Sequence, residues 1–309
     1  MATTTASALA AAITFKVQKK VLENLRAELV WADPAYAESG EFAPGYDTLT
    51  FVAVPDLTLT TTPLTEGTAP TANALAITTT TVSTDQYGDV VEITDIAKVK
   101  SPIEIVNIGT ERLSRQSKES IDQISRDVIA ASGTPFYPTG SSNTVRTDVA
   151  STEYATAADL RFLRTKMYKA SIPVFSDGYY RLFVSPEQGY ALRSDTATGG
   201  WIDVNKYSNP DVLLRGELGR QEGFRIMEVV NAPTFASTTT VHAAIAVGAI
   251  KAWGAGELQT FSTYHVAPGG DHSDVLAQKE LLGWKIDFGL AVLANNRYFR
   301  YETAAHAGF

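Results

Sequence analysis

The chain has 309 residues, 44% of them apolar and 19% charged, and a formal net charge of -8. These values exclude a disordered chain, which has few apolar residues and a high charge, and the ordinary counts of 22 glycines and 13 prolines exclude a fibrous protein. Cysteine is absent, which excludes disulfides, thiolate zinc sites and thiol nucleophiles, and the acidic balance argues against general nucleic-acid binding through a basic face.

The N-terminal segment predicts a helical arm. Apolar residues recur there at helical spacing at Val17, Val21, Leu22, Leu25 and Leu29. Lysines and one arginine occupy its other faces, so it is either a surface helix with solvated charges or a basic arm that contacts a partner or nucleic acid. The apolar run 8–13 is too short to span a bilayer, and no later segment reaches 18 uncharged apolar residues. We therefore expect a soluble protein made in the cytoplasm, with no membrane contact.

Residues 48–94 predict long antiparallel strands. Threonine and β-branched residues, which favour a pleated and half-exposed surface, alternate there with period two. The alternating stretches are 48–54, 57–60, parts of 75–82, and 90–94. The segment holds too few large apolar residues for a core of its own, and an isolated ribbon is marginally stable. We expect it to lie on a sheet or on a partner chain.

The next element is a long helix over 102–131. Ser101 and Glu104 form a capping box around Pro102, and Gly133 ends the helix. An apolar stripe runs through Val106, Leu113, Ile121, Ile124 and Val128. Thirty residues at 1.5 Å each span about 45 Å, so this helix should be a spine across a domain.

The second half of the chain predicts short strands mixed with helices. Helices are expected at 156–170 and 186–193, and strands at 180–184, 224–230 and 241–247. The apolar stretch 281–301 predicts two strands that meet near Asn295 and Asn296. No repeat of fixed period is present, and the class is α+β.

No catalytic pattern emerges from the sequence. The glycines of 216–223 precede a strand and lack phosphate-loop spacing, which predicts a turn with positive-φ glycines. His265, Asp271 and His272 could form a weak metal site, although isolated histidines usually make hydrogen bonds. The carboxylates of Asp177, Glu187 and Asp195 cluster in sequence without a sign of burial or pairing. We expect no catalytic residue, no cofactor and no metal.

The order of these parts resembles the major capsid proteins of tailed phages, which have the HK97-type fold, and in particular the phage N4-like coat protein family. Six short motifs carry the resemblance at 3–9, 63–67, 86–89, 177–180, 192–195 and 216–220, and Gly283-Trp284-Lys285 lies near its end at about Glu302. One departure is that the region 41–54 lacks the lysines and arginines expected where the first long strand begins.

The resemblance implies five parts. They are an N-terminal arm (1–44), an extended β-hairpin loop (45–93), a peripheral domain with the spine helix (94–174), an axial domain (175–265) and a return to the peripheral domain (266–309). It also implies an icosahedral shell of pentamers and hexamers that encloses double-stranded DNA without sequence specificity. Scaffolding, portal and decoration proteins are the further partners implied, and assembly would take place in the host cytoplasm.

Two alternatives come from other classes. An encapsulin-like compartment shell would share the fold and enclose an enzyme cargo, and genes for portal, terminase and tail proteins nearby would argue against it. An enzyme with a carboxylate site is disfavoured because the motif checks failed, and hydrolase activity in a purified monomer would support it.

Charge patterning predicts how subunits meet. Residues 27–97 contain eleven acidic residues and neither lysine nor arginine, whereas 98–118 carries five basic and two acidic residues. We expect the acidic ribbon to lie over basic helices of a neighbouring subunit, where opposite charges set register. The alternative is a solvated acidic ribbon held by backbone pairing. The expected intersubunit contacts are Asp47, Asp56, Glu66, Asp85, Asp89, Arg112, Arg115, Arg161 and Arg164.

Overall fold

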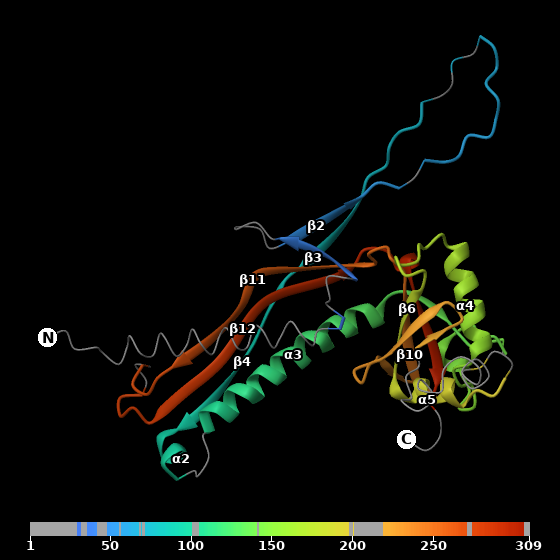
Figure 1. Cartoon of the computed structure of the whole chain (residues 1–309). Helices are drawn as coiled ribbons and strands as arrows, with labels where there is room; N and C mark the ends of the chain where they lie inside the picture. Colours follow the sequence, from blue (N-terminus) through green and yellow to red (C-terminus); the bar gives the residue numbers. More distant parts are fainter. Residues whose placement is uncertain are drawn as a thin grey trace.

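A computed structural model describes most of the chain. The described residues are 30–31, 36–41, 48–55, 57–67, 69, 72–100, 105–140, 142–197, 200, 219–270 and 274–305. They form an elongated first lobe, a rounded second lobe beside one end of it, and a long loop that projects away from both (Figure 1). None of the helices in this part of the chain combines the length and hydropathy that a bilayer span requires.

The first lobe is a four-stranded sheet with one long helix on its face. Its strand order is β1 (Ala37–Glu41), β11 (Trp253–Val266), β12 (Lys279–Val292) and β4 (Asp85–Thr94), with β1 parallel to β11 and the other pairs antiparallel. The long helix is α3 (Ile105–Ala131), preceded by the short α2 (Asp95–Lys100). Alternate β12 residues are buried, among them Trp284 and Ile286, because that face lies under the helix.

The second lobe is a sheet of seven strands. Six of them run in the order β5 (Thr134–Phe136), β13 (Tyr298–Ala304), β10 (Thr240–Val247), β6 (Tyr180–Val184), β8 (Phe224–Glu228) and β7 (Arg220–Gln221), and β9 (Thr234–Ala236) also pairs with β10. The helices α4 (Ala157–Lys169) and α5 (Pro186–Ser194) bury Leu160, Leu163 and Leu192 against one face. The helix α5 begins with a capping box between Ser185 and Gln188.

The two lobes share one apolar core. Trp31 and Trp253 are fully buried, and the Trp253 indole Nε1 donates to the Trp31 carbonyl oxygen over 3.1 Å. The backbone N–H of Trp31 donates to Asp122 of α3, and its ring lies 5.2 Å from that of Phe183 on β6. The Tyr298 hydroxyl donates to the carbonyl of Ile129 over 2.8 Å, so the end of α3 is fixed to the second lobe.

The predicted long helix is confirmed as Ile105–Ala131, while its expected cap at 101–104 and the arm helix of 17–29 lie outside the described residues. The positive φ of Gly133, +87°, confirms the helix stop. The strands at 180–184 and 241–247 and both shorter helices are confirmed, but the strand at 224–230 ends two residues early, at Glu228.

Two expectations about strands need correction. The strand predicted at 57–60 is wrong: these residues are exposed and unpaired within the described chain, so alternation alone could not make a strand there. The two strands expected within 281–301 exist, but they belong to different sheets, because the turn at Asn295–Arg297 carries the chain from one lobe to the other. The long strand β11 was not predicted, since Gly254 and Gly256 interrupt its apolar pattern.

Candidate intersubunit surfaces

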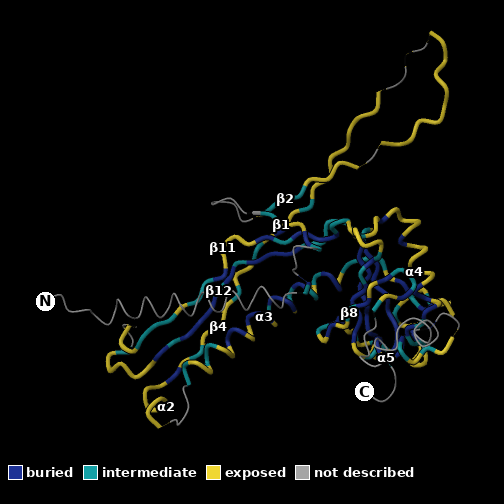
Figure 2. Tube along the Cα trace, viewed as in Figure 1, coloured by how far each residue is buried: buried dark blue, intermediate teal, exposed yellow. Residues whose placement is uncertain are grey.

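The projecting loop is the most exposed part of the described chain. It joins β2 (Thr48–Ala53) to β3 (Thr78–Ser83), an antiparallel pair, and every described residue between these strands is exposed (Figure 2). Six of them are large and apolar: Val54, Leu57, Leu59, Leu64, Leu75 and Ile77, with Leu59 at 88% exposure. Nothing in this part of the chain covers them, which is typical of a surface that binds a partner.

The base of this ribbon lies on glycines of the first sheet. Gly40, Gly256 and Gly289 lie opposite one another on β1, β11 and β12, forming a row across three strands. A Cβ on Gly289 would lie 2.3 Å from the Ser83 carbonyl oxygen, and one on Gly40 would lie 2.1 Å from the Leu49 side chain. A side chain at Gly289 would meet the Ser83 backbone and push the ribbon away from the sheet, whereas one at Gly40 would displace the Leu49 side chain. Gly289 therefore sets how closely the ribbon lies on the sheet.

The predicted acidic contacts that the structure describes lie in two places. Asp47 and Asp56 lie outside the described residues. Glu66 is exposed in the turn at the far part of the loop. Asp85 and Asp89 are on β4, which pairs with β12 along its length, so they belong to the first lobe and not to the free ribbon. The side-chain amide of Gln116 on α3 donates to Asp89, an engagement within the subunit.

The predicted basic contacts lie on two helices. Arg112 and Arg115 are exposed on α3, and the Arg115 guanidinium donates to Glu119 over 2.8 Å. On α4, Arg161 pairs with Glu222 over 2.9 Å, and Arg164 lies against Gly223. Both α4 arginines thus hold the turn between β7 and β8, a role that the helical pattern alone could not reveal.

A buried ion network connects the lobes and was missed from the sequence. Glu302 on β13 is fully buried and accepts two hydrogen bonds from Arg146, of 2.7 and 2.9 Å, and one from Arg300. Arg300 also donates to the carbonyls of Ala130 and Ser132 at the end of α3. The Glu302 hydrogen bond raises the pKa of Arg146. The sequence did hold a signal for this network, since Arg300 and Glu302 interrupt the largely apolar stretch 298–304.

The structure gives structural roles to several of the polar residues considered from the sequence. The imidazole of His265 lies 2.7 Å from Glu280, that of His242 3.1 Å from the Ser185 hydroxyl, and the part of the chain that is described holds no cluster with metal-ligand character. Asp271 and His272 lie outside it. The expectation that Asp177, Glu187 and Asp195 are unpaired is wrong for Asp177, which accepts from Arg181 over 2.7 Å, and the Glu187 carboxylate lies 3.5 Å from the His242 ring. Asp195 accepts the Ala157 N–H at the start of α4.

The turn predicted at the glycines of 216–223 is confirmed where it is described. Gly219 and Gly223 have φ values of +59° and +87°, and Gly223 joins β7 to β8. The non-glycine residue Glu222 also has a positive φ, +48°, in the same turn. Left-handed conformations at two successive residues are typical of tight hairpins. Gly216 itself lies outside the described residues.

One family model matches most of the chain, and solved structures share its fold. A family model described as phage capsid protein matches residues 77–299, well over half of the chain. Among solved structures, the capsid of cyanophage Pam1 is similar with a TM-score of 0.71 and 17% identity, covering 91% of this chain and 93% of that one. The capsid of cyanophage P-SCSP1u gives 0.66 and 17% over 88% of each chain, and that of Ralstonia phage GP4 gives 0.66 and 15% over 91% and 90%. No curated protein matches the sequence. The matched structures confirm the predicted HK97-type fold.

Proposed function

Because the chain belongs to the phage capsid protein family and is a major coat protein of the virion, we propose that it closes, as pentamers and hexamers, into an icosahedral shell around double-stranded DNA. The observation that carries this proposal is the projecting loop, whose six large apolar residues have no cover within the described chain. A second copy would bury them. The phage N4-like family remains the finer assignment that we propose, on the motifs at 63–67 and 86–89.

We propose a division of the chain that follows sheet membership. The extended loop and its ribbon span 48–83, since β4 pairs within the first lobe. The peripheral domain comprises β1, β4, α2, α3, β11 and β12, and the axial domain comprises the second sheet with α4 and α5. Under this division the axial domain ends at about Lys251 and not at the predicted residue 265, because β11 lies in the first sheet. Residues 298–304, predicted in the peripheral domain, belong to the axial domain, because β13 lies in the second sheet.

The partners of such a shell protein follow from the same proposal. Copies of itself are the first, and scaffolding, portal and decoration proteins and DNA are the others that we propose, with assembly in the host cytoplasm and no catalytic role. An encapsulin-like compartment is the alternative, since it would have the same fold with an enzyme inside. The chain's membership of the phage capsid protein family favours the phage shell.

Expression of the full chain and inspection by cryo-electron microscopy test the proposal. We expect closed shells with five-fold and six-fold capsomers, alone or once a scaffolding protein is added. Shells that copurify with an enzyme and exclude DNA would favour the compartment. A chain that stays monomeric with every scaffolding protein tried would contradict both.

We predict that charge reversal of Arg112 and Arg115 to glutamate weakens assembly, because acidic groups of a neighbour, among them the exposed Glu66 of its loop, lose their basic contact. Each exposed pair contributes only about 0–1 kcal/mol, but the contact is repeated at every subunit. Raised salt should weaken the wild type toward the variant. Light scattering across a salt series measures this. If both proteins assemble equally and respond equally to salt, the charge contact is absent and backbone pairing alone holds the ribbon.

The matching reversal on α4 needs a control for folding. Arg161 pairs with Glu222 inside the subunit, so its change to glutamate disturbs the β7–β8 turn as well as any neighbour. The substitution Glu222→Gln removes the same internal pair without reversing a charge on α4. Assembly that falls in Arg161→Glu but not in Glu222→Gln assigns the loss to the interface.

We also predict that mature particles carry no covalent cross-link through the extended loop. Some shells of this fold join a loop lysine to an asparagine of a neighbour, and residues 27–97 contain no lysine that could supply the amine. Denaturing gels of mature particles should show a single band at the 33.3 kDa of the monomer. A ladder of covalent oligomers would contradict this prediction.

A further inference from the structure

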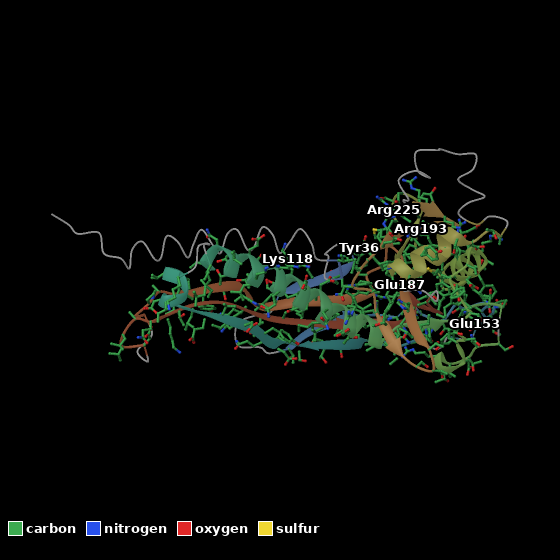
Figure 3. All side chains as sticks on the ribbon, turned by 90° about the horizontal axis from the view of Figure 1, so that it is seen from below. Tyr36, Lys118, Glu153, Glu187, Arg193 and Arg225 are labelled. Atoms are coloured by element: carbon green, nitrogen blue, oxygen red, sulfur yellow. The ribbon has the colours of Figure 1, made fainter. Side chains whose placement is uncertain are left out.

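Three arginines lie side by side at the edge of the second sheet. Arg181 on β6 lies opposite Arg225 on β8, and Arg225 in turn lies opposite Arg220 on β7. Residues opposite one another on neighbouring strands share a face of the sheet. Strands are about 4.8 Å apart, so these three residues, which we call the arginine row, extend over about 10 Å. Arg225 lies at the surface of the second lobe (Figure 3).

The charges in this row are only partly compensated. Like charges directly opposite on neighbouring strands are destabilising. The Arg181 guanidinium donates to Asp177, and this hydrogen bond lowers the pKa of that carboxyl group. Arg225 is exposed and has no ion pair or hydrogen bond to its side chain within the described chain. The three arginines and Asp177 thus leave a net charge of +2 on a small surface.

Aromatic rings hold two of the three guanidinium groups. Arg181 lies 4.8 Å from the ring centroid of Phe175, and Arg220 lies 4.8 Å from that of Tyr179. A guanidinium stacked on a ring keeps its in-plane N–H groups free for an oxyanion. The stacking also restricts the side chain, which lowers the entropy lost when an anion binds.

We propose that the arginine row binds phosphate groups, supplied either by a free oligophosphate such as a nucleoside triphosphate or by the backbone of nucleic acid. Arginine forks match phosphate oxygens bidentately, and a multiply charged phosphate matches the residual charge better than a single carboxylate does. Arg161 and Arg164 of α4 contact the turn that joins β7 and β8, so basic groups continue around this hairpin. The phosphate site itself does not rest on the proposed shell function. Only the choice of nucleic acid as the source of its phosphate groups rests on that function.

Calorimetric titration of the purified full chain tests the site with two probes, sodium tripolyphosphate and a random-sequence DNA duplex of twelve base pairs, at low salt. We expect the substitution Arg225→Gln to weaken tripolyphosphate binding about ten-fold, and the pair Arg220→Gln and Arg225→Gln to weaken it further. The control is Arg193→Gln on α5, an arginine outside the row that pairs with Glu228. It should leave the affinity unchanged, and thermal unfolding should show that all variants remain folded.

The two probes distinguish the sources of phosphate. If nucleic acid is the ligand, the plot of log affinity for DNA against log salt should lose about 2 from its slope in the double variant, because two phosphate contacts are lost. Weakened tripolyphosphate binding with an unchanged DNA slope would identify a free oligophosphate.

Two results would overturn the site. One is wild-type protein that fails to bind tripolyphosphate, or binds it equally well in the double variant. The other is a row that binds a synthetic peptide of residues 54–77 and neither phosphate probe, which would make it a contact for the loop of a second copy. Failure of the proposed function would be seen in a different experiment, in which the wild-type chain forms no shells.

Discussion

Replacing Glu302 by glutamine should destabilise the subunit by about 3 kcal/mol. Glu302 is fully buried, and both Arg146 and Arg300 direct their N–H groups at its carboxylate. Removing one partner of a buried ion network costs about 3–5 kcal/mol, because the remaining charges stay buried without compensation. The Arg146 side chain keeps 30% exposure, so water relieves part of its cost, and the lower end of that range applies. Urea unfolding of the unassembled subunit measures the loss.

The matched control is Glu119→Gln. Glu119 also pairs with an arginine, Arg115, but its side chain is 64% exposed and that of Arg115 68%. An exposed pair of this kind contributes about 0–1 kcal/mol. If both substitutions reduce the free energy of unfolding equally, burial is not what makes the Glu302 network important.

The consequence of the Glu302 change should extend to the junction of the lobes. Arg300 satisfies the carbonyl of Ala130, in the last turn of α3, and that of Ser132, just after it, and both would otherwise lack partners. A displaced Arg300 therefore loosens the end of the long helix from β13. Hydrogen exchange should be faster at 126–132 in Glu302→Gln than in the wild type and unchanged in Glu119→Gln.

The sequence predicted elements whose signals are local. The apolar stripe from Val106 to Val128 is enough to predict a helix, and Gly133 marks its end because glycine readily adopts the positive φ found there. Alternation over 57–60 is equally local, but a strand also needs a partner at hydrogen-bonding distance, and that information lies elsewhere in the chain. The pattern therefore predicted one strand that does not form.

The arginine row and the glycine row depend on contacts between residues far apart in the chain, and the sequence alone could not predict these contacts. Arg181, Arg220 and Arg225 are separated by up to 44 positions and come together only through the order of β6, β8 and β7. Gly40 and Gly289 are likewise brought into one row by pairing with β11. Net charge along the chain did predict an acidic segment, but it could not show that Asp85 and Asp89 belong to a packed strand.

Replacing residues 54–77 by the dipeptide Asn-Gly should abolish shell assembly while leaving the subunit folded. Ala53 and Thr78 lie opposite each other in the β2–β3 pair, so a two-residue turn closes the hairpin without strain. The described residues of the loop are exposed, and their removal should change the free energy of unfolding by less than about 0.5 kcal/mol. Sedimentation and electron microscopy of the variant should show only subunits and small oligomers.

Point substitutions separate the apolar contact from loop length. Leu59 and Leu64 are 88% and 74% exposed in the single subunit, and burying one such side chain on a neighbour is worth about 1.5–3 kcal/mol. Leu59→Ser should therefore raise the subunit concentration needed for assembly at least about ten-fold, whereas Thr60→Ser, next to it in the same loop, should not. Shells that form from Leu59→Ser at the wild-type concentration would show that the loop acts through its backbone or its acidic groups, because an exposed leucine that no neighbour covers contributes nothing to association.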